Sequence, residues 1–322
     1  MKSRSAWVIL ACGTVVTAAV WTPVAAAVMS KAPAVTVQAS TIANSIARND
    51  IDASGLAITA PLQPPQRIVA LAPSLAELAA EFTGADLGRI VGVSEYTDYP
   101  PALKAKPSIG SYSRFSLEKV VSLKPDLVLA TTDGNSKEQV LRLRELGLHV
   151  VTVAGGNLTE VLKSFKLIAR AMGAPARGDE MVRALTEGVG QARARAARRI
   201  RHPSILLQVG DDPLVVVGSH SFLNEAVEMI GARNLYGDAK DGYPRPSLED
   251  VLKRDPEQIL VLAIGQDLAQ AGKIAAAWQR LPTLQAVKKS AVKVLAADTL
   301  VRPSLRWLQG LLLLEQAVYA AP

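Results

Sequence analysis

Residues 116–129 read SLEKVVSLKPDLVL, and residues 247–260 read SLEDVLKRDPEQIL. Both stretches begin with Ser-Leu-Glu, continue with a short helical pattern, reach a proline followed by an acidic residue, and end in an apolar run. The proline and the acid keep the same register, as Pro125-Asp126 and Pro256-Glu257. Because one helix-to-strand unit recurs in the two halves of the chain, the sequence predicts two lobes that share one plan and face each other.

Apolar strands alternate with helices around both copies of this unit. The predicted strands are 67–71, 90–93, 127–130, 148–153, 204–209, 214–217, 259–263 and 292–296. The predicted helices are 116–123, 136–146, 158–172, 221–230, 247–254 and 304–319, with a polar, Ala/Arg/Glu-rich helix that ends near Arg199. Apolar strands that alternate with helices are typical of a parallel sheet covered on both faces. We therefore predict an α/β fold with two Rossmann-like lobes, each with a central parallel sheet, joined by a single long α-helix.

Acidic residues mark the starts of several predicted helices. Ser74 and Glu77 have the spacing of a capping box, so we expect this pair to open the helix after the first strand. Glu118 and Glu249 lie in the first turns of their helices, where an acid stabilises the helix dipole by about 0.3–1 kcal/mol. Because these two glutamates occupy equivalent positions in the two lobes, they also form a pair of acidic contacts suited to arginines on a two-fold symmetric partner.

The N-terminal residues have the composition of an export signal. Lys2 and Arg4 precede an apolar run over residues 6–20, which is short for a bilayer span of about 20 residues. We therefore expect a signal peptide and export. Cys12 leaves a lipid anchor as an alternative, which Leu10 disfavours.

The whole chain is expected to divide into five parts. These are a signal peptide (1–27), a disordered linker rich in Ala, Ser, Thr and Pro (28–65), an N-terminal α/β lobe (66–157), a helical segment that includes the interdomain helix (158–202) and a C-terminal α/β lobe (203–322).

Composition and motifs argue against several classes of protein. Much of the formal net charge of +7 lies in residues 177–201, without an aromatic-basic motif, so nucleic-acid binding is not expected. The chain has neither G-x-S-x-G nor G-x-G-x-x-G. Its histidines, His149, His202 and His220, lack the spacing of metal ligands. We therefore expect no enzymatic activity, no metal site and no cofactor.

Tyrosines are concentrated in predicted loops. Tyr96 and Tyr99 follow the second strand, while Tyr112 and Tyr243 each come shortly before the repeated Ser-Leu-Glu. Because loops at the carboxyl ends of parallel strands line the ligand crevice, Tyr112 and Tyr243 are expected to face each other across it. Flat, amphipathic rings suit a large planar ligand, although packing of the loops onto the sheet is an alternative role.

Asp298 and Arg302 flank the turn before the last predicted helix. An arginine in this place can donate hydrogen bonds to amide or carboxylate groups of a ligand, with Asp298 holding its side chain. An ordinary surface ion pair, which contributes little to stability, is the alternative.

Four stretches resemble the periplasmic binding proteins of ABC importers for cobalamin, iron-siderophores and haem, the class whose lobes are joined by a rigid helix. The resemblance covers roughly residues 66–320 and is carried by VGVSEYTDYPP (91–101) and by residues 116–129, 243–262 and 298–306. The Tyr-x-Asp-Tyr-Pro-Pro segment at 96–101 is the most specific of these and points to the cobalamin branch.

The resemblance implies a non-catalytic, monomeric periplasmic receptor that captures cobalamin between its lobes and delivers it to an ABC permease and its ATPase. Glu118 and Glu249 match the two docking glutamates of the family, which meet arginines of the permease. The ligand contacts that the resemblance implies are Tyr96, Tyr112, Tyr243, Asp298 and Arg302.

The chain also departs from the cobalamin branch. Tyr112 and Tyr243 stand where tryptophans are expected, and Thr131 replaces a third. Haem or a ferric siderophore therefore stays open as the ligand. A chelatase-like enzyme on a related fold, and a surface interaction protein, are the remaining alternatives.

Overall fold

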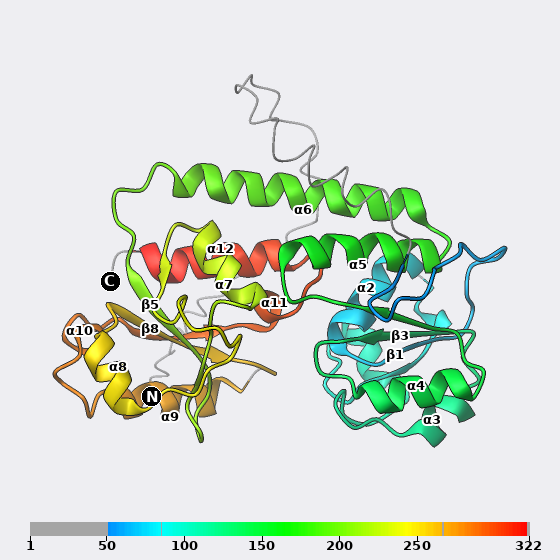
Figure 1. The fold of residues 1–322 in the computed structure, drawn as a ribbon, viewed down its shortest axis with the longest axis horizontal. Helices are drawn as coiled ribbons and strands as arrows, with labels where there is room; N and C mark the ends of the chain where they lie inside the picture. Colours follow the sequence, from blue (N-terminus) through cyan, green and yellow to red (C-terminus); the bar gives the residue numbers. More distant parts are fainter. Residues whose placement is uncertain (1–50, 85, 266, 321–322) are drawn as a thin grey trace, which may run out of the picture.

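The computed structural model describes residues 51–84, 86–265 and 267–320 (Figure 1). The predicted signal peptide at 1–27, and residues 28–50 of the predicted linker, lie outside the described residues. Within the described part of the chain, none of the helices combines the length and the apolar character that a membrane span requires.

The first lobe contains a sheet of four parallel strands. These are β1 (Ile68–Ala70), β2 (Ile90–Val93), β3 (Leu127–Thr131) and β4 (Val150–Val153), in the order β2-β1-β3-β4. Alternate strand residues enter two buried clusters, one shared with α2 (Pro73–Thr83) and α5 (Leu158–Ala171), the other with α3 (Leu117–Ser122) and α4 (Lys137–Glu145). Because both faces are covered, β1, β3 and β4 are buried throughout.

The second lobe repeats this plan. Its strands are β5 (Ser204–Gly210), β6 (Val215–Val216), β7 (Arg233–Asn234), β8 (Gln258–Ala263) and β9 (Val292–Ala296), in the order β6-β5-β8-β9 with β7 also beside β5. Every pairing is parallel except that of β5 with β6. The covering helices are α7 (Phe222–Met229) and α12 (Trp307–Tyr319) on one face, and α8 (Leu248–Arg254), α9 (Leu268–Trp278) and α10 (Gln285–Lys288) on the other.

One long helix, α6 (Pro175–Ala196), runs along both lobes and packs on α5 and α12 (Figure 1). Its buried residues recur every three or four positions and form one apolar face: Gly178, Met181, Leu185, Val189, Ala192 and Ala196. The predicted α/β class, with two lobes joined by a single long helix, is therefore confirmed. The sequence did not predict β7, α9, α10 or the short helix α11 (Asp298–Val301), nor the 3-10 turns η1 (Leu87–Arg89) and η2 (Pro101–Ala105).

The repeated unit has the same local structure in both lobes. Ser116 and Ser247 are N-caps, and each hydroxyl accepts a hydrogen bond of 3.2 Å from the backbone N–H three residues on. The acids after the two prolines fix the edges of neighbouring strands. Asp126 accepts from the N–H groups of Gln66 and Arg67 just before β1, and Glu257 accepts from the N–H of Ser204, the first residue of β5. The repeat therefore sets the register of each sheet.

The capping box predicted from Ser74 and Glu77 is wrong. The helix begins two residues earlier than this box requires, with Ala72 as N-cap and Pro73 in the first turn, and no side chain caps it. Glu77 is instead buried and accepts hydrogen bonds from Arg302 and Ser304 of the second lobe. A partner more than two hundred residues away outweighs the local motif.

The predicted disordered linker, 28–65, needs correction for its described part. Residues 51–65 pack on the first lobe, where Ile58 enters the core and the backbone N–H of Ala53 bonds to the carbonyl of Thr152. Asp52 is buried and accepts from Thr152 N at 3.0 Å and from the guanidinium of Arg144 at 3.0 Å. One acid with well-placed donors therefore fixes a segment whose composition predicts disorder.

Substituting Asp52 by alanine is expected to destabilise the protein by about 1–3 kcal/mol, because Arg144 and the backbone N–H groups of Ser54, Leu56 and Thr152 lose their acceptor. Burial opposes ionisation, but bonds from Ser54, Thr152 and Leu56 hold the pKa of Asp52 below 3.8. This stabilisation is therefore present above pH 3.8 and is lost as the pH falls through the lower pKa of the folded state. Urea unfolding at pH 7 and pH 3 measures both effects.

The control for this prediction is Asp211→Ala, at an exposed turn after β5, which should change the free energy of unfolding by less than about 0.5 kcal/mol. Equal stability of the Asp52 and Asp211 variants at pH 7 would show that the segment is not held by Asp52.

Candidate functional site

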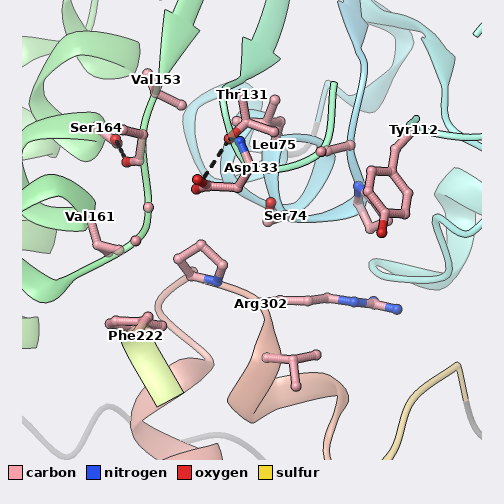
Figure 2. Close-up of a pocket in the computed structure, with 18 of the residues that line it drawn as sticks. Ser74, Leu75, Tyr112, Thr131, Asp133, Val153, Val161, Ser164, Phe222 and Arg302 are labelled. Atoms are coloured by element: carbon pink, nitrogen blue, oxygen red, sulfur yellow. Dashed lines mark hydrogen bonds between the residues drawn. The ribbon is translucent and has the colours of Figure 1, made fainter. Parts of the chain in front are cut away.

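A cavity of about 1000 Å³ lies between the lobes, at the upper end of the range for small-molecule sites. Its walls in the first lobe are the loops after β1, β2, β3 and β4, with contributions from α2 and α5. In the second lobe they are the loops after β6, β7 and β8, the residues around the end of α11, and the start of α7. Figure 2 shows Asp133 and Tyr112 on one side of the open space, and Arg302 and Phe222 on the other. The carboxyl ends of the parallel strands therefore form the cavity, as in other open α/β sheets.

Tyr96, Tyr112 and Tyr243 all line this cavity. The rings of Tyr96 and Tyr112 meet edge to face, with centroids 6.3 Å apart, and Tyr243 comes from the second lobe. These three tyrosine residues are 39–55% exposed, so aromatic surface is available for burial by a ligand. Desolvation by the cavity walls, followed by the charge of Asp133, raises the pKa of Tyr243 and keeps its hydroxyl protonated as a donor.

Two neighbouring residues fix the position of Tyr112. Gly134 has a φ of +113°, and a Cβ atom on it would lie 2.4 Å from the Tyr112 ring, so a side chain there would displace the ring. The buried side chain of Asn135 donates to the backbone carbonyls of Tyr112, at 2.6 Å, and Leu71, at 3.2 Å. Its amide oxygen accepts from Thr131 N at 2.8 Å, so one side chain joins three loops of the cavity.

The fourth loop tyrosine, Tyr99, has a different position. Its ring lies under the guanidinium of Arg306, 3.7 Å from the ring centroid, and it is not among the residues that line the cavity. Tyr99 therefore stacks on an arginine of the second lobe.

Arg302 lines the cavity but is directed mainly at carboxylates. Its guanidinium donates to Glu77 at 2.9 Å, to Asp298 at 3.1 Å and to Asp98, and only 8% of its side chain is exposed. We call these residues and Arg306 the interlobe ion cluster: Glu77, Asp98, Asp298, Arg302 and Arg306. Glu77 of α2 and Asp98 of the loop after β2 belong to the first lobe. The other three residues precede α12 in the second lobe.

The interlobe ion cluster joins the two lobes at the wall of the cavity. Burial raises the pKa of Glu77 even though Arg302 and Arg306 oppose the rise. Burial by itself lowers the pKa of Arg302, but the bonds to Asp98 and Glu77 outweigh it and raise that pKa. The predicted pairing of Asp298 with Arg302 is present, but Asp298 lies outside the cavity lining and most donors of Arg302 are already engaged.

Glu118 and Glu249 lie far from the interlobe ion cluster, on the exposed first turns of α3 and α8. In Figure 1 both helices lie on the side of the molecule opposite α6, with α3 on the first lobe and α8 on the outer part of the second. Neither glutamate forms a hydrogen bond or an ion pair with any other residue in the described ranges. Both carboxylates are therefore available to a partner molecule.

The cavity also contains polar residues that sequence reasoning missed. Asp133 follows β3 and faces the cavity, and His220 lines the second lobe. The sequence signal for Asp133 was its place directly after an apolar strand, the same signal that marked the tyrosine loops. No group of three or more His, Cys, Asp or Glu side chains among the described residues is arranged to hold a metal ion.

A family model and a curated relative both match most of this chain. A family model described as periplasmic binding protein matches residues 68–299. A vitamin B12-binding protein of Vibrio cholerae is 29% identical over 250 residues, which cover 77% of this chain and 87% of the relative.

Two solved structures agree with this similarity. The periplasmic vitamin B12 binding protein of Vibrio cholerae has a TM-score of 0.68 at 27% identity, over 80% of this chain and 99% of that one. A periplasmic haem binding protein from Pseudomonas aeruginosa has a TM-score of 0.69 at 26% identity, over 80% and 94% of the two chains.

Proposed function

The chain belongs to the periplasmic binding protein family, and on this premise we propose that it captures a corrinoid of the cobalamin type between its lobes. The observation that carries the proposal is the cavity of about 1000 Å³ with tyrosines from both lobes in its walls. Aromatic burial provides most of the contact area for a large macrocycle, and a few polar groups orient it.

The proposed role includes delivery to a membrane importer. Family membership supports an ABC permease and its ATPase as partners, and the two exposed glutamates on α3 and α8 are the proposed contacts with the permease. We also propose a periplasmic location, reached through the export signal at residues 1–27, and binding without chemical change of the ligand. Tyr96, Tyr112 and Tyr243 are the proposed ligand contacts, and Arg302, which is held by Asp298, lines the cavity beside them as a polar contact.

A second candidate ligand is haem, and it has its own supporting observation. Tyr112 lies in the cavity wall, and a tyrosine oxygen is one of the protein ligands that haem iron takes. The haem-binding relative shares the fold. A ferric siderophore is a third possibility within the same role.

The direct test is a titration of the purified protein with cyanocobalamin, haemin and a ferric siderophore, followed by absorbance and by heat. We expect saturable, one-to-one binding of cyanocobalamin that is tighter than binding of haemin. Tight binding of haemin with a tyrosinate-type spectrum, and none of cyanocobalamin, would replace the corrinoid by haem.

Replacing Tyr243 by alanine is expected to weaken cyanocobalamin binding by about 1 kcal/mol or more, roughly fivefold, because a large ring surface can no longer be buried. Tyr243→Phe separates the ring from its hydroxyl and should retain most of the affinity. Leu312→Ala, at a similarly exposed position on α12 outside the cavity lining, is the control. Unchanged affinity of Tyr243→Ala would assign this ring to loop packing.

A further inference from the structure

Asp133 is a charged side chain of the cavity that the proposed function does not yet use. We propose that it is a specificity-determining residue, which accepts hydrogen bonds from N–H donors on the ligand rim and so selects carboxamide-bearing over carboxylate-bearing macrocycles. This inference deepens the proposed function and rests on it.

The carboxylate of Asp133 has weak partners inside the protein. The hydroxyls of Thr131 and Thr132 lie 3.5 and 3.4 Å from its oxygens, at the outer limit of a hydrogen bond. No Lys or Arg among the described residues forms an ion pair with it. Since an ionised carboxylate accepts about four hydrogen bonds, much of its capacity remains for a ligand.

The loop after β4 fixes the carboxylate from the other side. The backbone of Gly155 lies against Asp133, since a Cβ atom on Gly155 would lie 3.0 Å from Asp133 Oδ2. A larger residue than glycine would therefore push the carboxylate from its place. Tyr243 of the facing lobe is close enough to Asp133 for its charge to raise the tyrosine pKa. Asp133 thus lies where a ligand clamped by the tyrosines would present its rim.

The remaining charges of the cavity wall do not favour a carboxylate ligand. Among the described lining residues, the carboxylate is that of Asp133 and the basic side chains are those of Arg302 and His220. Arg302 already donates hydrogen bonds to three carboxylates. His220 directs Nδ1 at the carbonyl of Lys240, 2.6 Å away, so Nδ1 donates and Nε2 is an acceptor in the neutral ring. A ligand carboxylate beside Asp133 would face its negative charge, whereas a ligand amide N–H would meet an acceptor that needs a donor.

The titration of Asp133 agrees with this geometry. Burial, together with the charge of Glu160, raises its pKa, although the Gly155 N–H and the threonine hydroxyls oppose the rise. The hydrogen bonds within the protein therefore do not fully offset the cost of burying the ionised carboxylate. N–H donors on a ligand would supply the missing hydrogen bonds.

The test uses two matched pairs of macrocycles on the full purified protein. One pair is cyanocobalamin and its separated monocarboxylic acids, in which one peripheral carboxamide is hydrolysed; the other is haemin and its bis-amide. In the unaltered protein we expect the amide form to bind at least about tenfold more tightly than its matched acid, for at least one cobalamin isomer or for the haem pair. In Asp133→Asn the ratio should fall below about threefold. Glu187→Gln, an equal charge change on an exposed part of α6, should keep the original ratio.

The outcomes separate this inference from the proposed function. If only the haem pair binds, the corrinoid proposal fails, and the amide-to-acid ratio of that pair still decides the role of Asp133. Equal ratios in the unaltered protein and Asp133→Asn, or tighter binding of the acid forms, would overturn the role of Asp133 while leaving corrinoid binding intact. No binding of either pair would overturn both.

Discussion

A protein in which Glu118 and Glu249 are both replaced by lysine is expected to support no ligand uptake, while it binds the ligand with unchanged affinity. The two carboxylates are exposed on α3 and α8, outside the cavity lining and unpaired with any other described residue. Losing one partner of an interfacial charge pair costs about 2–5 kcal/mol, or about 30-fold or more in docking affinity. Reversing both charges adds repulsion against the arginines that we propose on the permease.

Uptake of labelled cyanocobalamin by cells that depend on this protein measures the effect, with the affinity of the purified variant measured in parallel. The matched control is Asp179→Lys with Glu187→Lys, the same charge change on exposed positions of α6 at the opposite edge of the molecule. Each single glutamate variant should show an intermediate defect. Normal uptake by the double variant would remove the docking role from α3 and α8.

Replacing Arg302 by methionine is expected to destabilise the protein by about 3–5 kcal/mol even in the absence of ligand. Methionine fills similar volume but leaves Glu77, whose side chain is 3% exposed, without its closest cation, and leaves Asp98 and Asp298 without their shared guanidinium. Arg306, at 3.3 Å from Glu77, compensates only in part. The loss should also loosen the lobes relative to each other, since these acids come from both.

Urea unfolding measures this loss, and a double-mutant cycle identifies its cause. Adding Glu77→Met to Arg302→Met should recover part of the stability, because removing both partners is less costly than leaving one buried charge. Arg198→Met, an exposed arginine after α6, should change stability by less than about 0.5 kcal/mol. If Arg302→Met kept full stability and lost only ligand affinity, Arg302 would be a ligand donor rather than part of an interlobe ion cluster.

Local patterns were sufficient to predict the fold. The apolar strands, the two Ser-Leu-Glu units and the polar helix before Pro203 each contain their structural cause within one continuous stretch of sequence. The same holds for the tyrosine loops, because the end of a parallel strand is visible in the sequence and predicts a place at the crevice. Tyr96, Tyr112 and Tyr243 do line one cavity, whereas Tyr99, which follows the same strand as Tyr96, stacks on Arg306 instead.

Pairings between distant residues could not be predicted in this way. Glu77 has the spacing of a helix cap, yet Arg302 determines its place from 225 positions away. Asp52 lies in a segment of disordered composition, and its partner Arg144 is 92 positions away. Buried charges depend on tertiary partners, which sequence spacing does not encode.

The most direct test of a macrocycle held between the lobes is a crystal structure of the protein with cyanocobalamin. We predict that the corrin ring lies in the interlobe cavity, in contact with Tyr112 of the first lobe and Tyr243 of the second, with a peripheral carboxamide nitrogen within hydrogen-bonding distance of Asp133. A corrin bound outside this cavity, or in contact with one lobe alone, would contradict the proposed mode of capture.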